Sequence, residues 1–198
     1  MDPSTFSTAY GLSTSIGLRP FLTLALASLA MHFGYLHPSH AFAFLGTNGA
    51  TWLLAGLAVV EFAGDKIPVV DHLMHAVHFA VKPVAAAILV GGVTSGVSSD
   101  GGTGIAMGLA ALNAIGIHTG VATMRGATTA MTLGVGNPFI SVAEDVLAVI
   151  AALLSILLPF AGAALAIIVT LCIVLVARSV IRELRRSRTA SGSAAGPA

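Results

Sequence analysis

The sequence predicts an all-α fold: a polytopic integral membrane bundle of about six transmembrane helices. Composition is the first reason, because 56% of the 198 residues are apolar and only 9% are charged, whereas a soluble domain typically carries about 25% charged residues. The second reason is the spacing of the apolar residues, which form runs close to the roughly 20 residues that a spanning helix needs. We therefore expect the lipid bilayer to be the main partner of this chain.

Charge and cysteine content exclude other classes. The formal net charge is +1, so no basic face for nucleic acid is expected. The chain has a single cysteine, Cys172, inside an apolar run, which excludes an intrachain disulfide framework. Five of the nine basic residues lie near the C-terminus: Arg178, Arg182, Arg185, Arg186 and Arg188.

The predicted spans follow from run length and from helix-breaking residues. The apolar stretch 139–177 would extend about 60 Å as one helix, twice the thickness of the hydrocarbon core. It must therefore fold back, and Pro159 and Gly162 mark the break. Gly64 and Pro68 predict that the second helix is interrupted. The six predicted spans cover residues 16–34, 51–65, 71–90, 103–122, 140–158 and 160–182.

These spans define a transmembrane domain over residues 16–182. A polar N-terminal segment, 1–15, precedes it, and a basic and then disordered cytoplasmic tail, 183–198, follows it. Lys and Arg are absent from residues 35–50 and 91–102, so the positive-inside rule places both termini in the cytoplasm. The expected location is a bacterial cytoplasmic membrane.

A first polar cluster lies at the end of the second predicted span, in EFAGDKIPVVDH. Glu61 and Asp65 are four residues apart, so on a helix they share a face and repel each other. They need a cation, a shared proton or a basic neighbour. One alternative is a solvated cytoplasmic turn around Asp65 and Lys66, with Asp71 capping the next helix.

The next helix carries a polar stripe. Asp71, His75, His78 and Lys82 follow spacings of four, three and four residues, which place them on one helical face. Histidines and carboxylates relay protons or hold a divalent ion. A structural network that satisfies Glu61 and Asp65 across the bundle is the alternative. Lys82 should face the protein interior, with a carboxylate as partner.

A second acidic cluster occurs in GNPFISVAED. Ser141 and Glu144 fit a capping box, and Asp145 adds negative charge near a helix start. Helix initiation therefore explains this cluster. It lies on the same predicted side of the membrane as Glu61 and Asp65. A single acidic site made of the two clusters is therefore the alternative.

Intramembrane ionisable residues favour a small transporter or channel for a cation, either a divalent metal or an ion coupled to protons. The sequence names no cofactor, and a bound divalent cation is the candidate that these residues favour. The rival hypothesis is a non-transporting scaffold whose polar clusters are structural, and no motif favours an enzyme. The candidate ion ligands are Glu61, Asp65, Asp71, His75 and His78, with Glu144 and Asp145 as further contributors. The expected counter-charges are Lys82, Arg125 and Arg19.

Glycines recur in the fourth predicted span. Gly104 and Gly108 form one pair four residues apart, and Gly116 and Gly120 form another. Such spacing lets a second helix approach closely. Tight helix packing, within the chain or in a homo-oligomer through this face, is one interpretation, and a conduit lined by backbone is the other.

Three motifs occur together in one order: GLRPF from Gly17, EFAGDKIPVVDH from Glu61 and NPFISVAEDVLA from Asn137. In these the chain resembles the domain-of-unknown-function 4126 family of bacterial and plant membrane proteins. The resemblance runs from about residue 17 to 158. It implies a helical membrane protein of unassigned activity and gives none of the polar residues a role.

A second similarity concerns the ion chemistry. The segment from Glu61 to Lys66 is similar to the Glu-x-Gly-Asp-Lys/Arg-Thr/Ser signature of calcium or manganese/proton exchangers. Two residues, rather than one, separate Glu61 from Gly64, and Ile67 stands where the signature has Thr or Ser. The extra residue turns Glu61 by about 100° on a helix.

Overall fold

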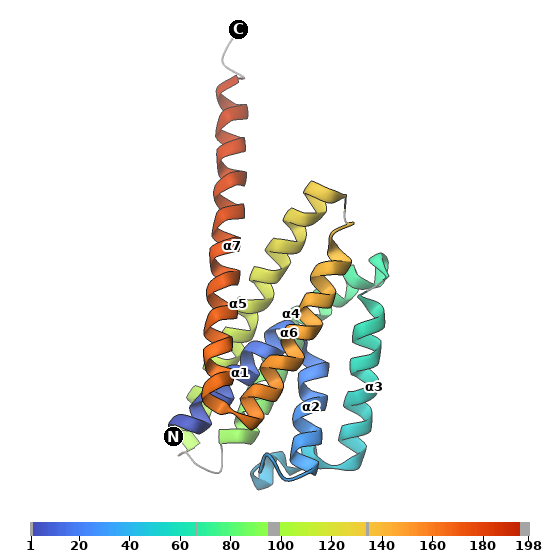
Figure 1. The fold of residues 1–198 in the computed structure, drawn as a ribbon, viewed down its shortest axis with the longest axis vertical. Coiled ribbons are helices and arrows are strands. Elements are labelled where there is room, and N and C mark those ends of the chain that lie inside the picture. Colours follow the sequence, from blue (N-terminus) through green and yellow to red (C-terminus); the bar gives the residue numbers. More distant parts are fainter. Residues whose placement is uncertain (1, 66, 95–99, 134, 195–198) are drawn as a thin grey trace.

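The computed structural model describes residues 2–65, 67–94, 100–133 and 135–194, and this part of the chain is all-α, as predicted (Figure 1). It contains seven α-helices and one short 3-10 helix, η1. The elements are α1 (Pro3–Leu18), α2 (Pro20–His32), η1 (His40–Gly46), α3 (Asn48–Gly64), α4 (Pro68–Thr94), α5 (Asp100–Thr132), α6 (Asn137–Leu157) and α7 (Pro159–Ala194).

Among the described residues, four helices are long and apolar enough to cross a membrane: α4, α5, α6 and α7. A fifth crossing arises if η1 and α3, which are bent by 59° to each other, act as one span. The predicted break at Pro159 is confirmed, and α3 ends at Gly64 before α4 begins at Pro68. The predicted total of six spans is not confirmed, because the first predicted span is two separate helices.

Pro20 divides that first segment. The residue before a proline is pushed away from helical geometry, and Arg19 is extended, with φ −136° and ψ 96°. Proline at the first position of the next helix is well tolerated because it has no backbone N–H to leave unpaired. Arg19 therefore ends α1 and Pro20 begins α2, and neither helix is long enough to cross the bilayer alone.

The α1–α2 pair is a re-entrant hairpin. At the start of α1, Ser4 and Thr8 border one small cavity with Tyr35, beyond α2, and with Val93, at the end of α4. At the end of α1, the Leu18 carbonyl contacts Lys82, which is halfway along α4. The chain thus enters to mid-depth and returns to the same end of the bundle (Figure 1).

α1 lies inside the bundle, packed against α4, α5, α6 and α7. All but its first turn and a few positions are buried, including Leu12 and Ile16. The N-terminal cap is Asp2, whose pKa is lowered by hydrogen bonds from the Ser4 hydroxyl and from the Thr5 backbone amide and hydroxyl. Residues 3–15, expected to precede the helical domain, therefore belong to its first helix, and most of those from Ser7 onward are buried in its core.

The predicted glycine face on α5 has two environments. A Cβ added at Gly104, Gly108 or Gly116 would meet nothing within 4 Å. A Cβ at Gly120 would lie 2.1 Å from an Ile173 methyl of α7. Tight packing within the chain therefore applies to Gly120 and not to the other three, and a homo-oligomer through this face stays a prediction.

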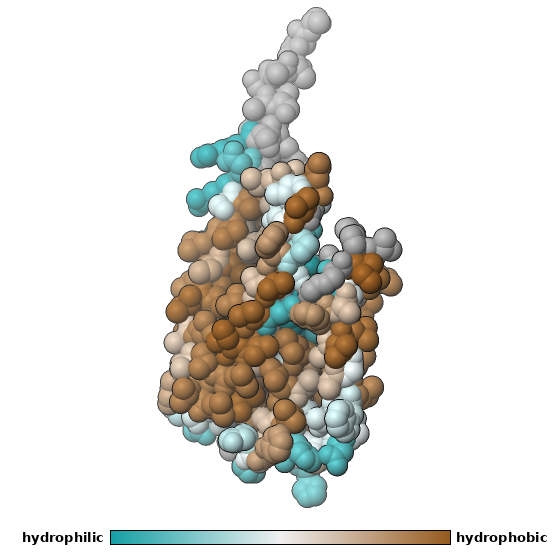
Figure 2. Space-filling model, turned by 45° about the vertical axis from the view of Figure 1, so that its right-hand side comes forward, coloured by the Kyte–Doolittle hydropathy of each residue, from teal (hydrophilic) through white to brown (hydrophobic). Residues whose placement is uncertain are grey.

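The outer surface suits a bilayer. Figure 2 shows apolar side chains over most of one face, with polar ones gathered mainly at its two ends. α7 continues through Ala194, so the predicted disordered tail is helical up to that residue, because Arg and Ala are good helix formers. The start of α1 and the described end of α7 lie at opposite ends of the long axis in Figure 1. This arrangement does not support our expectation that both termini share one side of the membrane.

Candidate functional site

The hairpin tip places two open helix ends inside the bundle. Each end has backbone groups without helical partners, and each such group costs several kcal/mol at membrane depth if it stays unpaired. The C-terminal end of α1 carries partial negative charge and the N-terminal end of α2 carries partial positive charge. Residues of opposite charge are therefore needed at the two ends.

Lys82 of α4 satisfies the end of α1. Its Nζ donates to the carbonyls of Gly17 and Leu18, each at 2.9 Å, and lies 3.0 Å from Nδ1 of His118. An ammonium group has three donors and no acceptor, so these three contacts use all of them. The prediction that a carboxylate is the partner of Lys82 is wrong, because the open end of α1 supplies backbone carbonyls instead.

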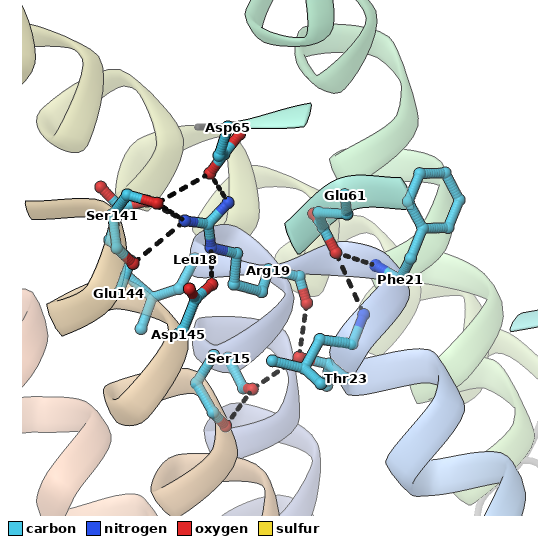
Figure 3. Close-up of polar contacts among 12 residues, drawn as sticks. Ser15, Leu18, Arg19, Phe21, Thr23, Glu61, Asp65, Ser141, Glu144 and Asp145 are labelled. Carbon is cyan, nitrogen blue, oxygen red and sulfur yellow. Dashed lines mark hydrogen bonds and ion pairs between the residues drawn. The ribbon is translucent and has the colours of Figure 1, made fainter. Parts of the chain in front are cut away.

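Glu61 of α3 satisfies the start of α2. Its Oε2 accepts hydrogen bonds from the backbone amides of Phe21 and Leu22, both at 3.1 Å (Figure 3). The side chain is 1% exposed. A carboxylate at a helix N-terminus is a favourable arrangement, and it holds α3 to the hairpin tip.

The other oxygen of Glu61 faces a histidine. Its Oε1 lies 3.4 Å from Nε2 of His78 on α4. Both atoms are buried, and neither has a hydrogen-bond partner within the described residues. Buried polar atoms are rarely left without a hydrogen-bond partner, and here both atoms of one contact lack one, whereas in the contact of Arg19 Nε with Asp145 only Nε does.

Arg19, at the hairpin tip, lies among the carboxylates of Asp65, Glu144 and Asp145 (Figure 3). Its Nη1 donates to Asp65, and its Nε lies 2.8 Å from Oδ1 of Asp145. Its Nη2 donates to the carbonyl and hydroxyl of Ser141 at 3.1 and 3.0 Å. One guanidinium thus joins the hairpin to α6 and to the residue that ends α3.

Arg125 of α5 forms the second half of this network. Its Nε and Nη2 each lie 3.0 Å from an oxygen of Glu144, a bidentate pair. Its Nη2 is also 3.4 Å from Asp65. Planar bidentate pairs are the strongest arginine–carboxylate contacts. The two predicted acidic clusters therefore meet in space, around two arginines.

The predicted capping role of Ser141 and Glu144 is wrong. α6 begins at Asn137 with Gly136 as its cap residue, and no side chain caps it. Ser141, Glu144 and Asp145 are buried one to two turns further on. Pro138 lies in the first turn of α6, where proline is favoured. The helix therefore begins before Ser141, the residue that was expected to cap it.

The predicted ion ligands do not converge on one point. Within the described part of the chain, no group of three or more His, Cys, Asp or Glu side chains is arranged to hold a metal ion. Asp65 pairs with arginines while Glu61 caps α2. His75 instead stacks on His118, with ring centroids 5.4 Å apart. The side chain of Asp71, and all of Lys66, lie outside the described residues.

Two cavities border the network. One, of about 220 Å³, lies beside α2, α3 and α6 and is lined by Arg19, Glu61 and Asp145 among others. The second, of about 550 Å³, lies between α4 and α5 and is lined by His75 and His118 among others. Glu61 lines the first cavity, and His75, one turn from His78 on α4, lines the second.

A family model described as a domain of unknown function, DUF4126, matches residues 6–179. The chain belongs to this family. No curated protein and no solved structure matches the chain. The match covers the re-entrant hairpin and the spanning part of α7, so the DUF4126 domain includes the whole charged network. The similarity to cation/proton exchangers has no counterpart in these comparisons.

In this DUF4126 chain, the helix break at Arg19 and Pro20 was not predicted from the sequence. The two residues lie in an apolar run that is long enough to span the membrane, and the length of that run favoured one continuous helix. The signal was available, because a proline preceded by arginine inside such a run predicts both a break and a buried charge.

Proposed function

We propose that this integral membrane protein is a small transporter or channel that moves protons, and that Glu61 and His78 carry them. The observation that supports this most directly is the contact between Glu61 Oε1 and His78 Nε2, two buried atoms 3.4 Å apart without other partners in the described residues. Carboxylate and imidazole are the side chains that most often transfer protons. A movement of a few tenths of an ångström would bring them to hydrogen-bond distance.

The proposal narrows the expected cation to a proton. Asp65, Glu144 and Asp145 contact arginines, which compete with any metal for the same oxygens. A proton needs only one acceptor atom, and Glu61 Oε1 can bind it because no other group in the described residues donates to this oxygen. Helices broken at mid-membrane are also the usual setting of coupling-ion sites in transporters.

The proposed location is a bacterial cytoplasmic membrane with the C-terminus inside. Arg178, Arg182 and Arg186 lie on α7 toward its C-terminal end, after the apolar run that ends at Ala177, and positive charge favours the cytoplasmic side. Because the termini lie at opposite ends (Figure 1), the N-terminus is then on the outside. This replaces the arrangement with two cytoplasmic termini.

Proton flux in vesicles tests the proposal. The purified protein is reconstituted with an internal pH-sensitive dye, and a potassium diffusion potential drives protons inward. We expect Glu61→Gln to lower the flux by about tenfold or more. The glutamine carbonyl still accepts from Phe21 and Leu22, so the hairpin tip stays capped while the titratable group is lost.

Glu183→Gln is the matched control, because Glu183 is 78% exposed on α7 and far along the chain from the hairpin. Its flux should equal that of the wild type. Equal flux in wild type and Glu61→Gln contradicts the proposal. Absence of flux in the wild type, with a lower thermal midpoint in Glu61→Gln, favours the scaffold hypothesis instead.

A further inference from the structure

We propose that the cleft between α4 and α5 binds a small organic acid that also carries a hydroxyl or amino group. This rests on the function proposed above, since it names the solute that moves with the proton. The cleft has a volume of about 550 Å³, within the usual range for small-molecule sites. Its polar or aromatic lining consists of His75 and Phe79 of α4, His118, Arg125 and Thr129 of α5, and Asn137 of α6.

The lining favours an anion because each of its ionisable groups is basic. His75, His118 and Arg125 border the cleft, and the carboxylate of Glu144 contacts Arg125 without lining it. Acidic side chains are absent from the cleft lining within the described residues. A carboxylate in the cleft would therefore meet donors and no like charge at contact distance.

His118 presents a donor to the cleft. Lys82 Nζ lies 3.0 Å from its Nδ1, and an ammonium group only donates. Nδ1 must then accept, which leaves the imidazole proton on Nε2. His118 itself is 4% exposed and lines the cleft. The backbone of His75 is hydrogen-bonded to this imidazole, so a carboxylate in the cleft would share the Nε2–H with the His75 carbonyl, and the charge of buried Lys82 strengthens that donor.

Asn137 presents an acceptor. Its Nδ2 donates to Thr129 Oγ1 at 2.8 Å, and Thr129 Oγ1 donates to the carbonyl of Arg125 at 2.9 Å. Because that hydroxyl proton is already used, Thr129 can only accept from Asn137, and the orientation of the amide is fixed. Asn137 Oδ1 is buried without a hydrogen-bond partner among the described residues. A ligand hydroxyl or amino group would satisfy it.

The spacing of these groups suits one small molecule. Thr129 lies one helical turn beyond Arg125, about 6 Å along α5, and Asn137 is bonded to Thr129. A carboxylate near His118 and Arg125 thus leaves the adjacent hydroxyl or amino group pointing toward Asn137. The apolar walls, which include Ala76, suit an aliphatic side chain on the same molecule.

Charge balance links the acid to the proton. Four described carboxylates surround the hairpin tip (Glu61, Asp65, Glu144 and Asp145) together with three cations (Arg19, Lys82 and Arg125). An incoming hydroxy acid adds a further negative charge at low dielectric, which is costly, whereas the ammonium group of an amino acid balances its carboxylate. A proton bound between Glu61 and His78 offsets the charge of a hydroxy acid, so a hydroxy acid and the proton are expected to bind together.

Thermal unfolding of the purified protein in detergent tests binding. The probes are 2-hydroxy-4-methylpentanoate and leucine, each at millimolar concentration. 4-Methylpentanoate lacks the donor, leucinol lacks the carboxylate, and inorganic phosphate is an anion of another shape. We expect at least one of the first two to raise the midpoint by about 3 °C. The other three should leave it unchanged.

Two variants locate the site. Asn137→Ala should remove the stabilisation. Thr123→Ala should keep it, because the Thr123 hydroxyl bonds its own helix at Thr119 and is not part of the cleft lining. The proposal is overturned if neither probe stabilises the wild type, if 4-methylpentanoate or phosphate stabilises it equally, or if Asn137→Ala retains the full shift.

These outcomes separate the two proposals. Proton flux that depends on Glu61, with no stabilisation by either probe, supports proton movement and contradicts the binding of an organic acid. Stabilisation that depends on Asn137, with no proton flux in vesicles, leaves an acid-binding cleft and removes proton movement.

Discussion

Lys82 and Glu61 carry opposite charges because they face opposite ends of broken helices. Lys82 contacts backbone carbonyls at the end of α1, and Glu61 contacts backbone amides at the start of α2. The sequence identified both as charges inside apolar runs that need partners. It did not identify the partners, since backbone groups are available only where a helix breaks. His78 was likewise predicted as part of a functional stripe. That it faces Glu61 Oε1 could be seen only in the folded structure.

Lys82→Met tests this assignment at the level of one residue. The substitution keeps the apolar stem but leaves the Gly17 and Leu18 carbonyls unpaired in the core. Each lost hydrogen bond to a charged group is worth about 1.5–3 kcal/mol, so we expect the free energy of unfolding to fall by about 3 kcal/mol or more. Denaturation in mixed micelles measures it.

Arg182→Met is the control for Lys82→Met, because it also replaces a cation by methionine, at an exposed position on α7. Its effect should stay within about 0.5 kcal/mol. A loss in Lys82→Met no larger than that of the control would show that the hairpin end does not depend on the ammonium group.

Two prolines had different consequences for predicting the helices. The break at Pro159 was predictable because the apolar run was far too long for one span. The break at Pro20 was not inferred because residues 16–34 have a suitable length for a span, and hydropathy alone does not distinguish a continuous helix from a hairpin of two half-helices. The distinction depends on partners such as Glu61 that lie far away in the sequence.

Packing where α6 turns into α7 gives a test at the level of elements. A Cβ on Gly162 would lie 2.5 Å from the backbone N and Cα of Ser155, and backbone atoms cannot move aside easily. We expect Gly162→Ala to lower the free energy of unfolding by about 2 kcal/mol. Denaturation in mixed micelles again provides the measurement.

Gly116→Ala is the matched substitution, since its added Cβ meets nothing within 4 Å. It should be neutral or stabilise the protein by up to about 1 kcal/mol, because alanine favours a helix over glycine. Equal losses in the two variants would show that helix propensity, and not the contact with Ser155, sets the effect.

For the whole molecule, a re-entrant hairpin would change the sidedness of the chain. Six crossings would place both termini on one side, whereas a hairpin followed by five crossings, the upper number that the helices allow, would place them on opposite sides. The all-α membrane class could be predicted from composition, because it depends on the total apolar content. The sidedness could not, because it depends on whether two short helices cross the bilayer or turn back, which Arg19 and its partners decide.

Labelling of single cysteines in intact cells tests that sidedness. In a Cys172→Ser background, cysteine is introduced at Ser4, at Tyr35 or at Arg186, all of which are exposed. A membrane-impermeant maleimide should label Ser4→Cys and Tyr35→Cys in intact cells, because both ends of the hairpin lie on one side. Arg186→Cys should react only after permeabilisation. Labelling of Ser4→Cys and Arg186→Cys from the same side would mean that the α1–α2 segment crosses the membrane, and the buried contacts of Arg19, Glu61 and Lys82 could not then form at the tip of a re-entrant hairpin.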